Sequence, residues 1–243
     1  MDIIKLKEIV QSSAPIVFFG GAGTSTESGI PDFRSANGLF RTGHGREHPP
    51  EEVLSRDFFH TQTAEFYRFY TSRMIHKDAQ PNAAHRALAT LEAQGRLKAV
   101  ITQNIDGLHQ AAGSQNVLEL HGSVHRNYCM VCEAYYPLDH ILASPEPIPR
   151  CTKCGGIVKP DVVLYQEQLD TQTFADAADW ISAAEMLIVA GTSLSVYPAA
   201  GLIQHYKGDR LLLINKSPTP YDGYANYMIN DSIGKVLSVL AEG

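Results

Sequence analysis

The sequence predicts a doubly wound α/β fold, together with a smaller domain made of a zinc-binding module and a helical insertion. Two features predict a parallel sheet: short apolar runs recur along the chain, and segments with a helical pattern separate them. Unbroken apolar runs are typical of parallel strands covered on both faces, and strands that alternate with helices form doubly wound sheets. A third feature, the paired cysteines, predicts the zinc-binding module.

Apolar runs provide the expected strands. In chain order they are Ile16–Phe19, Ala99–Thr102, Val117–Leu120, Val162–Tyr165, Met186–Ala190 and Leu211–Ile214. The expected helices are Asn82–Gln94, Asp170–Ala184 and Pro198–Lys207. The first of these helices has Pro81 and Asn82 at its start and Gly95 just past its end, which are common residues at helix boundaries.

Two stretches depart from this alternation. Residues 36–80 combine charged and aromatic side chains, as in RDFFHTQTAEFYRFY, and contain no strand-like run, so they predict a helical insertion. Residues 125–157 contain all the cysteines and a proline-rich loop at Pro145, Pro147 and Pro149. This second stretch predicts a module that a metal ion holds together.

Composition limits the classes of function. With 243 residues, of which 44% are hydrophobic and 19% charged, the chain is globular and can bury a substantial core. Its net charge of −6 argues against broad nucleic-acid binding, which needs a basic face, but is compatible with a small basic peptide as a partner. The first residues, MDIIKLKEIV, lack the apolar stretch of a signal peptide, and no segment approaches the roughly 20 apolar residues of a membrane helix. We therefore expect a cytoplasmic protein without membrane contact.

The cysteines give the most specific isolated signal. Cys129 and Cys132 form one C-x-x-C pair, Cys151 and Cys154 form another, and residues 133–150 separate the two. This spacing favours a tetrahedral zinc ion with four thiolate ligands, and a site with four protein ligands leaves no position for water. The expected zinc is therefore structural. A redox dithiol is a less favoured alternative, and a nucleic-acid-binding zinc ribbon is disfavoured because residues 133–150 are not basic.

Short polar signatures follow most of the apolar runs. They are Gly21-Ala22-Gly23, Gln103-Asn104-Ile105-Asp106, His121-Gly122-Ser123, Gly191-Thr192-Ser193 and Asn215-Lys216-Ser217. In a parallel sheet these positions are the carboxyl ends of strands, where α/β proteins bind ligands. One shared crevice explains them together, although Gly, Asn and Ser also end strands as ordinary turn residues.

The first signature resembles a dinucleotide-binding loop but departs from its usual form. In the stretch FFGGAGTSTESGIPDFRS, the position of the third fingerprint glycine is Thr26, and no acidic residue ends a second strand about 20 residues later. A hydride-transferring dehydrogenase is therefore disfavoured. Gly21 and Gly23 let the backbone approach a phosphate, or form a tight turn without a ligand. Residues 31–35 suggest a loop over the ligand, with Arg34 near phosphate or ribose and Phe33 stacked on a ring or packed in the core.

His121 is the candidate general base. It follows the run VLEL at the predicted ligand edge, and the pKa of a free imidazole lies near neutrality. A structural histidine is the alternative. Asn104 and Asp106 can hydrogen-bond an amide or position a water molecule, although both are also common in turns at strand ends.

Taken together, the motifs resemble those of the sirtuins, the NAD-dependent protein deacylases. GAGTSTESGIPDFRS, TQNIDGLH, LHGS, the paired C-x-x-C, GTSLSVYPAA and INKS occur here in the sirtuin order, from about residue 6 to the C-terminus. The resemblance implies a Rossmann-like NAD-binding domain of residues 1–35, 81–124 and 158–243, an insertion of residues 36–80 that includes a cofactor-binding loop, and a zinc module of residues 125–157. It also implies that NAD is consumed as a co-substrate, beside a structural zinc ion.

The resemblance assigns roles to individual residues. His121 is the general base, Asn104 is a second catalytic residue, and Val163 borders the acyl-lysine tunnel and pairs with the substrate peptide. The implied NAD contacts are Gly21, Ala22, Gly23, Thr26, Asp32, Phe33, Arg34, Gln103, Asn104, Ile105, Asp106, His121, Gly191, Thr192, Ser193, Asn215, Lys216 and Ile233. The zinc ligands are Cys129, Cys132, Cys151 and Cys154.

The implied activity is removal of acetyl groups from protein lysines, giving nicotinamide, free lysine and O-acetyl-ADP-ribose. The chain departs from the family where Tyr165-Gln166-Glu167 replaces Phe-Gly-Glu, and where Tyr67 and Tyr70 take the positions of the Tyr-x-x-Arg pair of sirtuins that remove acidic acyl groups. A neutral acyl group is therefore expected, while Arg68 and Arg73 keep succinyl removal open. ADP-ribosyl transfer and a non-enzymatic NAD-sensing module remain as alternatives. The expected partners are acetyl-lysine proteins or peptides, with no direct nucleic-acid binding, and the chain is expected to be a monomer.

Overall fold

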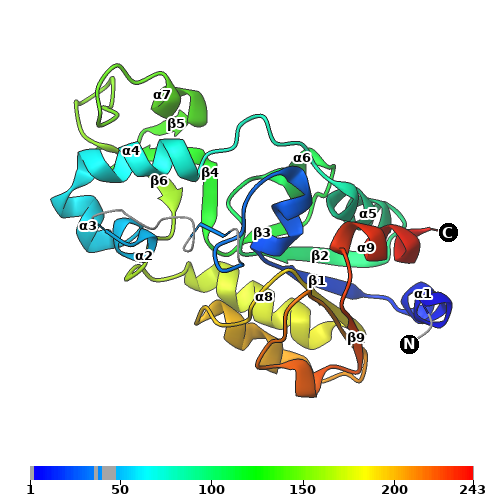
Figure 1. Ribbon diagram of the computed structural model, residues 1–243. Helices are drawn as coiled ribbons and strands as arrows, with labels where there is room; N and C mark the ends of the chain where they lie inside the picture. Colours follow the sequence, from blue (N-terminus) through cyan, green and yellow to red (C-terminus); the bar gives the residue numbers. More distant parts are fainter. Residues whose placement is uncertain (1–2, 36–37, 40–47, 243) are drawn as a thin grey trace.

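Two sheets organise the chain. The computed structural model describes residues 3–35, 38–39 and 48–242 (Figure 1). A six-stranded sheet has the order β3-β2-β1-β7-β8-β9, with every neighbouring pair parallel, and a three-stranded sheet has the order β5-β4-β6. The larger sheet confirms the predicted doubly wound α/β class. The chain adds β2 and β3 on one side of β1, and later adds β7, β8 and β9 on the other side.

The parallel strands are short and mostly buried on both faces. β1 (Ile16–Gly20), β7 (Met186–Ala190) and β8 (Leu211–Ile214) contain only buried residues, which explains their unbroken apolar sequences. The remaining strands are β2 (Leu97–Thr102), β3 (Val117–Glu119) and β9 (Tyr227–Ile229). The last of these was not expected from the sequence.

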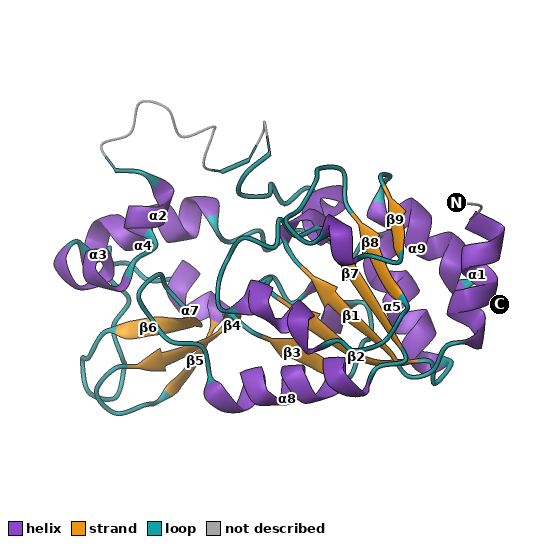
Figure 2. Cartoon of the chain, turned by 90° about the horizontal axis from the view of Figure 1, so that it is seen from below, coloured by secondary structure: helices purple, strands orange, loops and turns teal. Residues whose placement is uncertain are grey.

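Helices cover both faces of this sheet (Figure 2). On one face lie α1 (Ile3–Ser12), α5 (Ala83–Ala93) and α9 (Ile233–Ala241), which share a core with alternate residues of the strands. On the other lie α8 (Thr171–Ala183) and the 3-10 helix η2 (Ala199–His205). Capping residues fix where two of these helices begin, since the side chains of Asn82 and Asp170 accept hydrogen bonds from the first turns of α5 and α8.

The smaller domain has its own core. It combines α2 (Pro50–Val53), α3 (Arg56–Thr61) and α4 (Thr63–Arg73) with α7 (Leu138–Leu142) and the strands β4 (Gly122–Cys129), β5 (Tyr135–Pro137) and β6 (Val158–Val162). Figure 1 shows these elements together at one end of the molecule. The described part of the predicted insertion is helical, while its residues 36–37 and 40–47 lie outside the described residues, as do residues 1–2 and 243. Three short segments complete the fold: α6 (Leu108–Ala111) and the 3-10 helices η1 (Ala22–Ser28) and η3 (Asp222–Tyr224).

Several sequence predictions need correction. The predicted parallel strand Val162–Tyr165 is wrong: the strand is β6, it ends at Val162, and it pairs antiparallel with β4. In β6 the buried residues alternate with the half-buried Lys159 and Asp161, so its sequence is not an unbroken apolar run. The apolar residues after Val162, which were predicted as part of the strand, form a loop. The segment Pro198–Lys207 forms the 3-10 helix η2 rather than an α-helix. Helices α1 and α9 were not expected.

The proposed domain boundaries stay predictions. Strand β4 runs across the position 124/125 at which the sequence analysis divides two domains, whereas β6 begins directly after the proposed boundary at 157/158. Within the described part of the chain, no helix is both long and apolar enough to cross a membrane.

Candidate active site

A cavity of about 790 Å³ lies between the carboxyl edge of the parallel sheet and the smaller domain. Loops that follow β1, β2, β3, β7 and β8 line it, together with residues of the smaller domain. The predicted NAD and substrate residues all line this one cavity: Gly21, Ala22, Gly23, Thr26, Asp32, Phe33, Arg34, Gln103, Asn104, Ile105, Asp106, His121, Val163, Gly191, Thr192, Ser193, Asn215, Lys216 and Ile233. Their individual roles remain proposals.

The glycines after β1 pack against the loop that follows β7. The Gly23 N–H donates to the carbonyl oxygen of Gly191 at 2.8 Å, and a Cβ atom added at Gly23 would lie only 2.7 Å from the Gly191 Cα. Gly21 is the N-cap of η1, which contains Gly23, and its C-cap Gly29 has the left-handed conformation, φ 83°, two residues before Pro31. The missing third glycine is therefore explained by a short 3-10 helix in place of a long α-helix. Gly21 and Gly23 allow two backbone loops to approach each other directly beneath the cavity.

Gly191→Ala tests this close approach. Gly191 has φ 62°, and a Cβ atom there would lie 2.5 Å from the Thr24 backbone nitrogen. We expect the variant to lose about 1–3 kcal/mol of unfolding free energy through backbone strain, and to bind NAD more weakly because both loops must shift. Thermal unfolding and NAD titration measure the two effects. Gly223→Ala is the control, since no atom lies within 4 Å of its added Cβ; equal behaviour of the two variants would contradict the prediction.

A chain of polar contacts crosses the edge of the sheet from β2 to β8. The Gln103 side-chain amide donates to Thr192 Oγ1 at 3.1 Å. The Thr192 N–H donates to Asn215 Oδ1 at 3.2 Å, and the Asn215 amide donates back to the Thr192 carbonyl at 2.9 Å. Three of the sequence signatures are thus held in fixed positions relative to one another at the cavity wall.

Ser25 is the centre of a second polar network. Its hydroxyl donates to Asp106 Oδ2 at 2.7 Å and accepts a hydrogen bond from the Asn104 amide at 3.0 Å. His85 completes the network, because its Nδ1 accepts from the Asn82 N–H and its Nε2 therefore carries the proton that faces Ser25 Oγ at 3.5 Å. The network fixes the side chains of Asn104 and Asp106 at the cavity wall.

Sequence reasoning missed Ser25 and His85. Both are buried, and the sequence analysis named Thr26 and Asn82, which lie near them in the sequence, instead. A signal for His85 was present: it occupies the third position of a helix that begins after Asn82, where a side chain can accept from the N-cap N–H in a capping box. Glu27 was missed as well. Its carboxylate accepts from Ser232 Oγ and the Gly234 N–H at the start of α9, beside the predicted adenine contact Ile233.

Two buried histidines should make the protein sensitive to acid. Burial lowers the pKa of His85 to about 4 and that of His109 to about 3, and the rings lie 4.7 Å apart. The histidines of the unfolded chain bind protons at a higher pKa than those of the folded chain. The free energy of unfolding therefore keeps its full value above about pH 6.5 and decreases as the pH falls toward the folded-state pKa values. Each histidine should cost about 1.4 kcal/mol per pH unit in that window, or about 2 kcal/mol at pH 5.

Urea unfolding of the wild-type chain and of His109→Leu at pH 7.5 and 5.0 tests this expectation. The variant should lose less stability than the wild-type chain on acidification, because leucine cannot bind a proton. His205→Gln, at an exposed position, should keep the wild-type pH dependence. An unchanged pH dependence in His109→Leu would contradict the assignment.

His121 is held in one tautomer. Its Nδ1 lies 3.0 Å from the carbonyl oxygen of Gln103, and a carbonyl only accepts, so Nδ1 carries the proton and Nε2 is left with a free lone pair. Burial lowers the pKa of His121, and the hydrogen bond to Gln103 partly opposes that change. At neutral pH the ring is therefore neutral and can accept a proton at Nε2.

The strand end after β6 lies beside this histidine. The Val163 N–H donates to the carbonyl oxygen of His121 at 3.0 Å. The Glu167 carboxylate accepts from the Leu164 N–H at 2.8 Å and pairs with Lys159 at 3.1 Å, so Glu167 of the unusual Tyr-Gln-Glu sequence holds this loop. Arg34 interacts with Tyr165 of the same loop through its charge and a side-chain hydrogen bond. Burial raises the pKa of Tyr165, and the interaction with the Arg34 guanidinium partly opposes that increase.

The four cysteines form one cluster. Their Sγ atoms all lie within 4.8 Å of one another, with the Cys129–Cys154 and Cys132–Cys151 pairs at 3.4 and 3.6 Å. Tetrahedral zinc with bonds of about 2.3 Å places its sulfur ligands about 3.8 Å apart, so the residues fit that ion. The Tyr136 hydroxyl donates to Cys151 Sγ at 3.1 Å, and backbone N–H groups of Val131 and Lys153 also point to thiolates, as in metal knuckles.

Comparisons with known proteins agree with this geometry. The Sir2 family model matches residues 21–198. A protein from Clostridium acetobutylicum named NAD-dependent protein deacetylase is 60% identical over 238 residues, which cover 98% of this chain and 97% of the relative. A protein of the same name from Cutibacterium acnes is 52% identical over 236 residues, covering 97% of this chain and 96% of the relative.

Solved structures give the same result. A Sir2 protein with a deacetylated p53 peptide and 3′-O-acetyl-ADP-ribose superposes with a TM-score of 0.90 at 36% identity, covering 99% of this chain and 97% of the other. A complex of a Sir2 homologue with NAD gives 0.88 at 37% identity, covering 99% and 93%. Sir2Tm bound to a propionylated peptide gives 0.84 at 36% identity, covering 98% and 96%. On the evidence of sequence and fold alike, the chain belongs to the Sir2 family.

Proposed function

We propose that this chain removes acetyl groups from protein lysine side chains and consumes NAD in doing so. The products are nicotinamide, free lysine and O-acetyl-ADP-ribose. One observation carries the proposal: the free Nε2 of His121 belongs to a cavity that is lined by all the predicted NAD residues and by Val163. The names of the curated relatives and the ligands in the related solved structures support it.

The proposed roles follow from the contacts. Bound NAD would supply an electrophilic ribose carbon, to which the acyl oxygen of the substrate bonds as nicotinamide leaves. The 2′ oxygen of the ribose then attacks the acyl carbon, and one water molecule completes the release of free lysine and O-acetyl-ADP-ribose. His121 accepts a ribose hydroxyl proton at Nε2, while Gln103 holds the tautomer through its carbonyl. Asp106 and Asn104, fixed through Ser25, orient the nicotinamide amide. Gln103, Thr192 and Asn215 hold the riboses.

The zinc site has a structural role in this proposal. Cys129, Cys132, Cys151 and Cys154 would hold the ion, and four thiolates leave no coordination position for a substrate. The ion would join the turn after β4 to the turn before β6, and so fix the smaller domain beside the cavity.

A neutral acyl group is the favoured substrate. Tyr67 is buried and its hydroxyl donates to the Val158 carbonyl, while Tyr70 is buried on α4 with a hydroxyl that has no hydrogen-bond partner among the described residues. Neither can neutralise a carboxylate. Arg68 does not revive the acidic alternative, because it pairs with Glu65 and its side chain is 72% exposed.

Removal of acidic acyl groups remains a second candidate for one reason: Arg73, one turn further along α4, lines the cavity. A panel of peptides that differ only in the acyl group separates the two. Acetyl and propionyl peptides should turn over faster than the succinyl peptide, and faster turnover of the succinyl peptide would overturn the neutral preference.

The reaction itself is tested by product analysis. Incubation with an acetyl-lysine peptide and NAD should release nicotinamide, deacetylated peptide and O-acetyl-ADP-ribose in equal amounts. If the ADP-ribose instead becomes attached to protein, the reaction is ADP-ribosyl transfer. If NAD binds and no product forms, the chain is a sensing module and the proposal fails.

A further inference from the structure

Strand β4 contains a bulge at the joint between the two domains. Ser123 is opposite Asp161 and Asn127 is opposite Pro160, so three residues of β4, Val124 to Arg126, have no counterpart in β6. A bulge of this kind bends its strand and redirects its side chains, and bulges are common next to active sites. This one begins three residues after His121.

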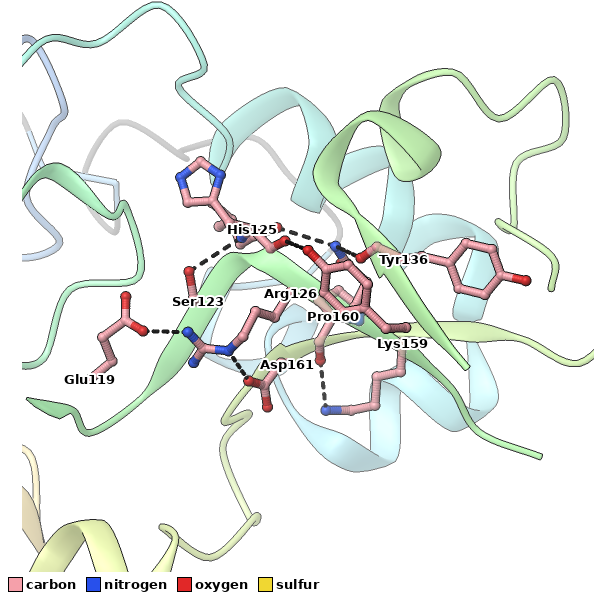
Figure 3. Close-up of polar contacts among 11 residues, drawn as sticks. Glu119, Ser123, His125, Arg126, Tyr136, Lys159, Pro160 and Asp161 are labelled. Carbon is pink, nitrogen blue, oxygen red and sulfur yellow. Dashed lines mark hydrogen bonds and ion pairs between the residues drawn. The ribbon is translucent and has the colours of Figure 1, made fainter. Parts of the chain in front are cut away.

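Two residues of the bulge contact the loop after β2, and the third points away from it. The Val124 N–H donates to the Ile105 carbonyl at 3.0 Å, and His125 Nε2 donates to the Asp106 carbonyl at 3.1 Å. Both acceptors belong to the loop after β2 that lines the cavity. Arg126 points in another direction, toward two carboxylates (Figure 3).

Arg126 bridges the ends of two strands that belong to different sheets. Its Nε donates to Asp161 Oδ2 at 2.8 Å and its terminal nitrogen to Glu119 Oε2 at 2.5 Å. The Glu119 side chain is only 8% exposed, whereas that of Asp161 is 41% exposed. Glu119 therefore depends on Arg126 for compensation of its charge, and without the guanidinium two carboxylates would face each other across the joint.

The two bridged residues stand at equivalent positions. Glu119 is two residues before His121, and Asp161 is two residues before Val163. Beyond the bridge, His121 and Val163 are joined by the hydrogen bond between the Val163 N–H and the His121 carbonyl. The bridge and this hydrogen bond together fix the distance between the two segments.

We propose that Arg126 is a positioning residue for deacylation: by bridging Glu119 and Asp161, it holds the base His121 in place relative to the peptide-binding segment at Val163. This inference rests on the proposed function. Arg126 does not line the cavity, so the proposed role needs no contact between Arg126 and either substrate. It acts on the geometry in which the acyl group and the ribose meet, and therefore on steps that need both substrates.

The expected signature separates this role from simple stabilisation. Arg126→Met keeps most of the aliphatic part of the side chain but removes the guanidinium N–H donors. It should lower kcat/KM for the acetyl-lysine peptide by about tenfold, with unchanged affinity for ADP-ribose and unchanged zinc content. Among the residues that the structure describes, no hydrogen bond joins Arg126 to the loops after β1, β7 and β8, which line the part of the cavity proposed for the nucleotide.

Two further variants show whether the bridge itself is responsible. Arg126→Lys can pair with one carboxylate but cannot span both, so it should recover only part of the activity. Glu119→Gln should lower activity as well, and combining it with Arg126→Met should cost less than the product of the two single effects, because they share one interaction. Arg68→Met is the matched control, since that arginine pairs with Glu65 on the exposed side of α4.

The measurements are steady-state kinetics with varied peptide and varied NAD, ADP-ribose titration, zinc content and thermal unfolding. Activity of Arg126→Met within twofold of wild type would overturn the proposal, and so would a loss of activity that tracks loss of zinc or of folded protein. Absence of turnover in the wild-type chain would instead reject the proposed function, and this inference with it. Wild-type turnover with the peptide-specific loss in Arg126→Met supports the positioning role.

Discussion

Replacing His121 with alanine is expected to lower kcat for deacetylation by about 10²–10⁴-fold, the usual contribution of a positioned general base. The reason is the free lone pair on Nε2, which the hydrogen bond from Nδ1 to the Gln103 carbonyl keeps available. ADP-ribose affinity should change little, because the Gln103–Thr192–Asn215 chain does not depend on the imidazole. Steady-state assays and ADP-ribose titration measure the two effects.

Two comparisons sharpen this prediction. His121→Asn keeps a donor for the Gln103 carbonyl but has no base, so it should be as inactive as the alanine variant while remaining folded. In the wild-type chain, kcat/KM should be constant through neutral pH and fall only in acid, because burial lowers the pKa of His121 below its usual 6.5. More than a tenth of wild-type activity in both variants would exclude His121 as the base.

Removing the zinc ion is expected to abolish activity by unfolding the smaller domain. The four Sγ atoms join the turn after β4 to the turn that precedes β6, and the domain core includes Cys129 and Cys151 themselves. Structural zinc sites contribute folding free energy directly, so the purified chain should hold about one zinc per molecule and lose helical and strand signal on chelation. Circular dichroism, metal analysis and activity should change together.

Cys151→Ser is the corresponding variant, since it removes one ligand and the acceptor for the Tyr136 hydroxyl. It should lose zinc and deacetylase activity together. Refolding with added zinc should restore the chelated wild-type chain but not the variant. A metal-free chain that keeps its fold and its activity would contradict the structural role.

Much of the larger domain could be predicted from the sequence, because its central strands are buried on both faces. Burial makes β1, β7 and β8 unbroken apolar runs, and the signatures that follow them can meet at one edge only if the strands are parallel. The cysteine cluster was also predictable, since C-x-x-C spacing places two thiolates on one turn.

The smaller domain was harder to predict because its sheet has only three strands and one exposed side. Strand β6 has the pattern Val158-Lys159-Pro160-Asp161-Val162, and a proline and two charged residues conceal it, while the more apolar residues after Val162 form a loop. The interactions of Arg126 could not be predicted at all, because they depend on a bulge that brings β3 and β6 together. Ser25 and His85 likewise act through contacts between residues far apart in the sequence.

A crystal structure with NAD and an acetyl-lysine peptide bound at the same time tests most directly whether the strand ends form a single reaction centre. The account predicts that the nicotinamide ribose lies beside His121, with a ribose hydroxyl within hydrogen-bond distance of Nε2. It also predicts that the peptide pairs with the segment at Val163 and that the nicotinamide amide faces Asp106. Binding of NAD at another surface, or a ribose separated from His121 by the width of the cavity, would contradict it.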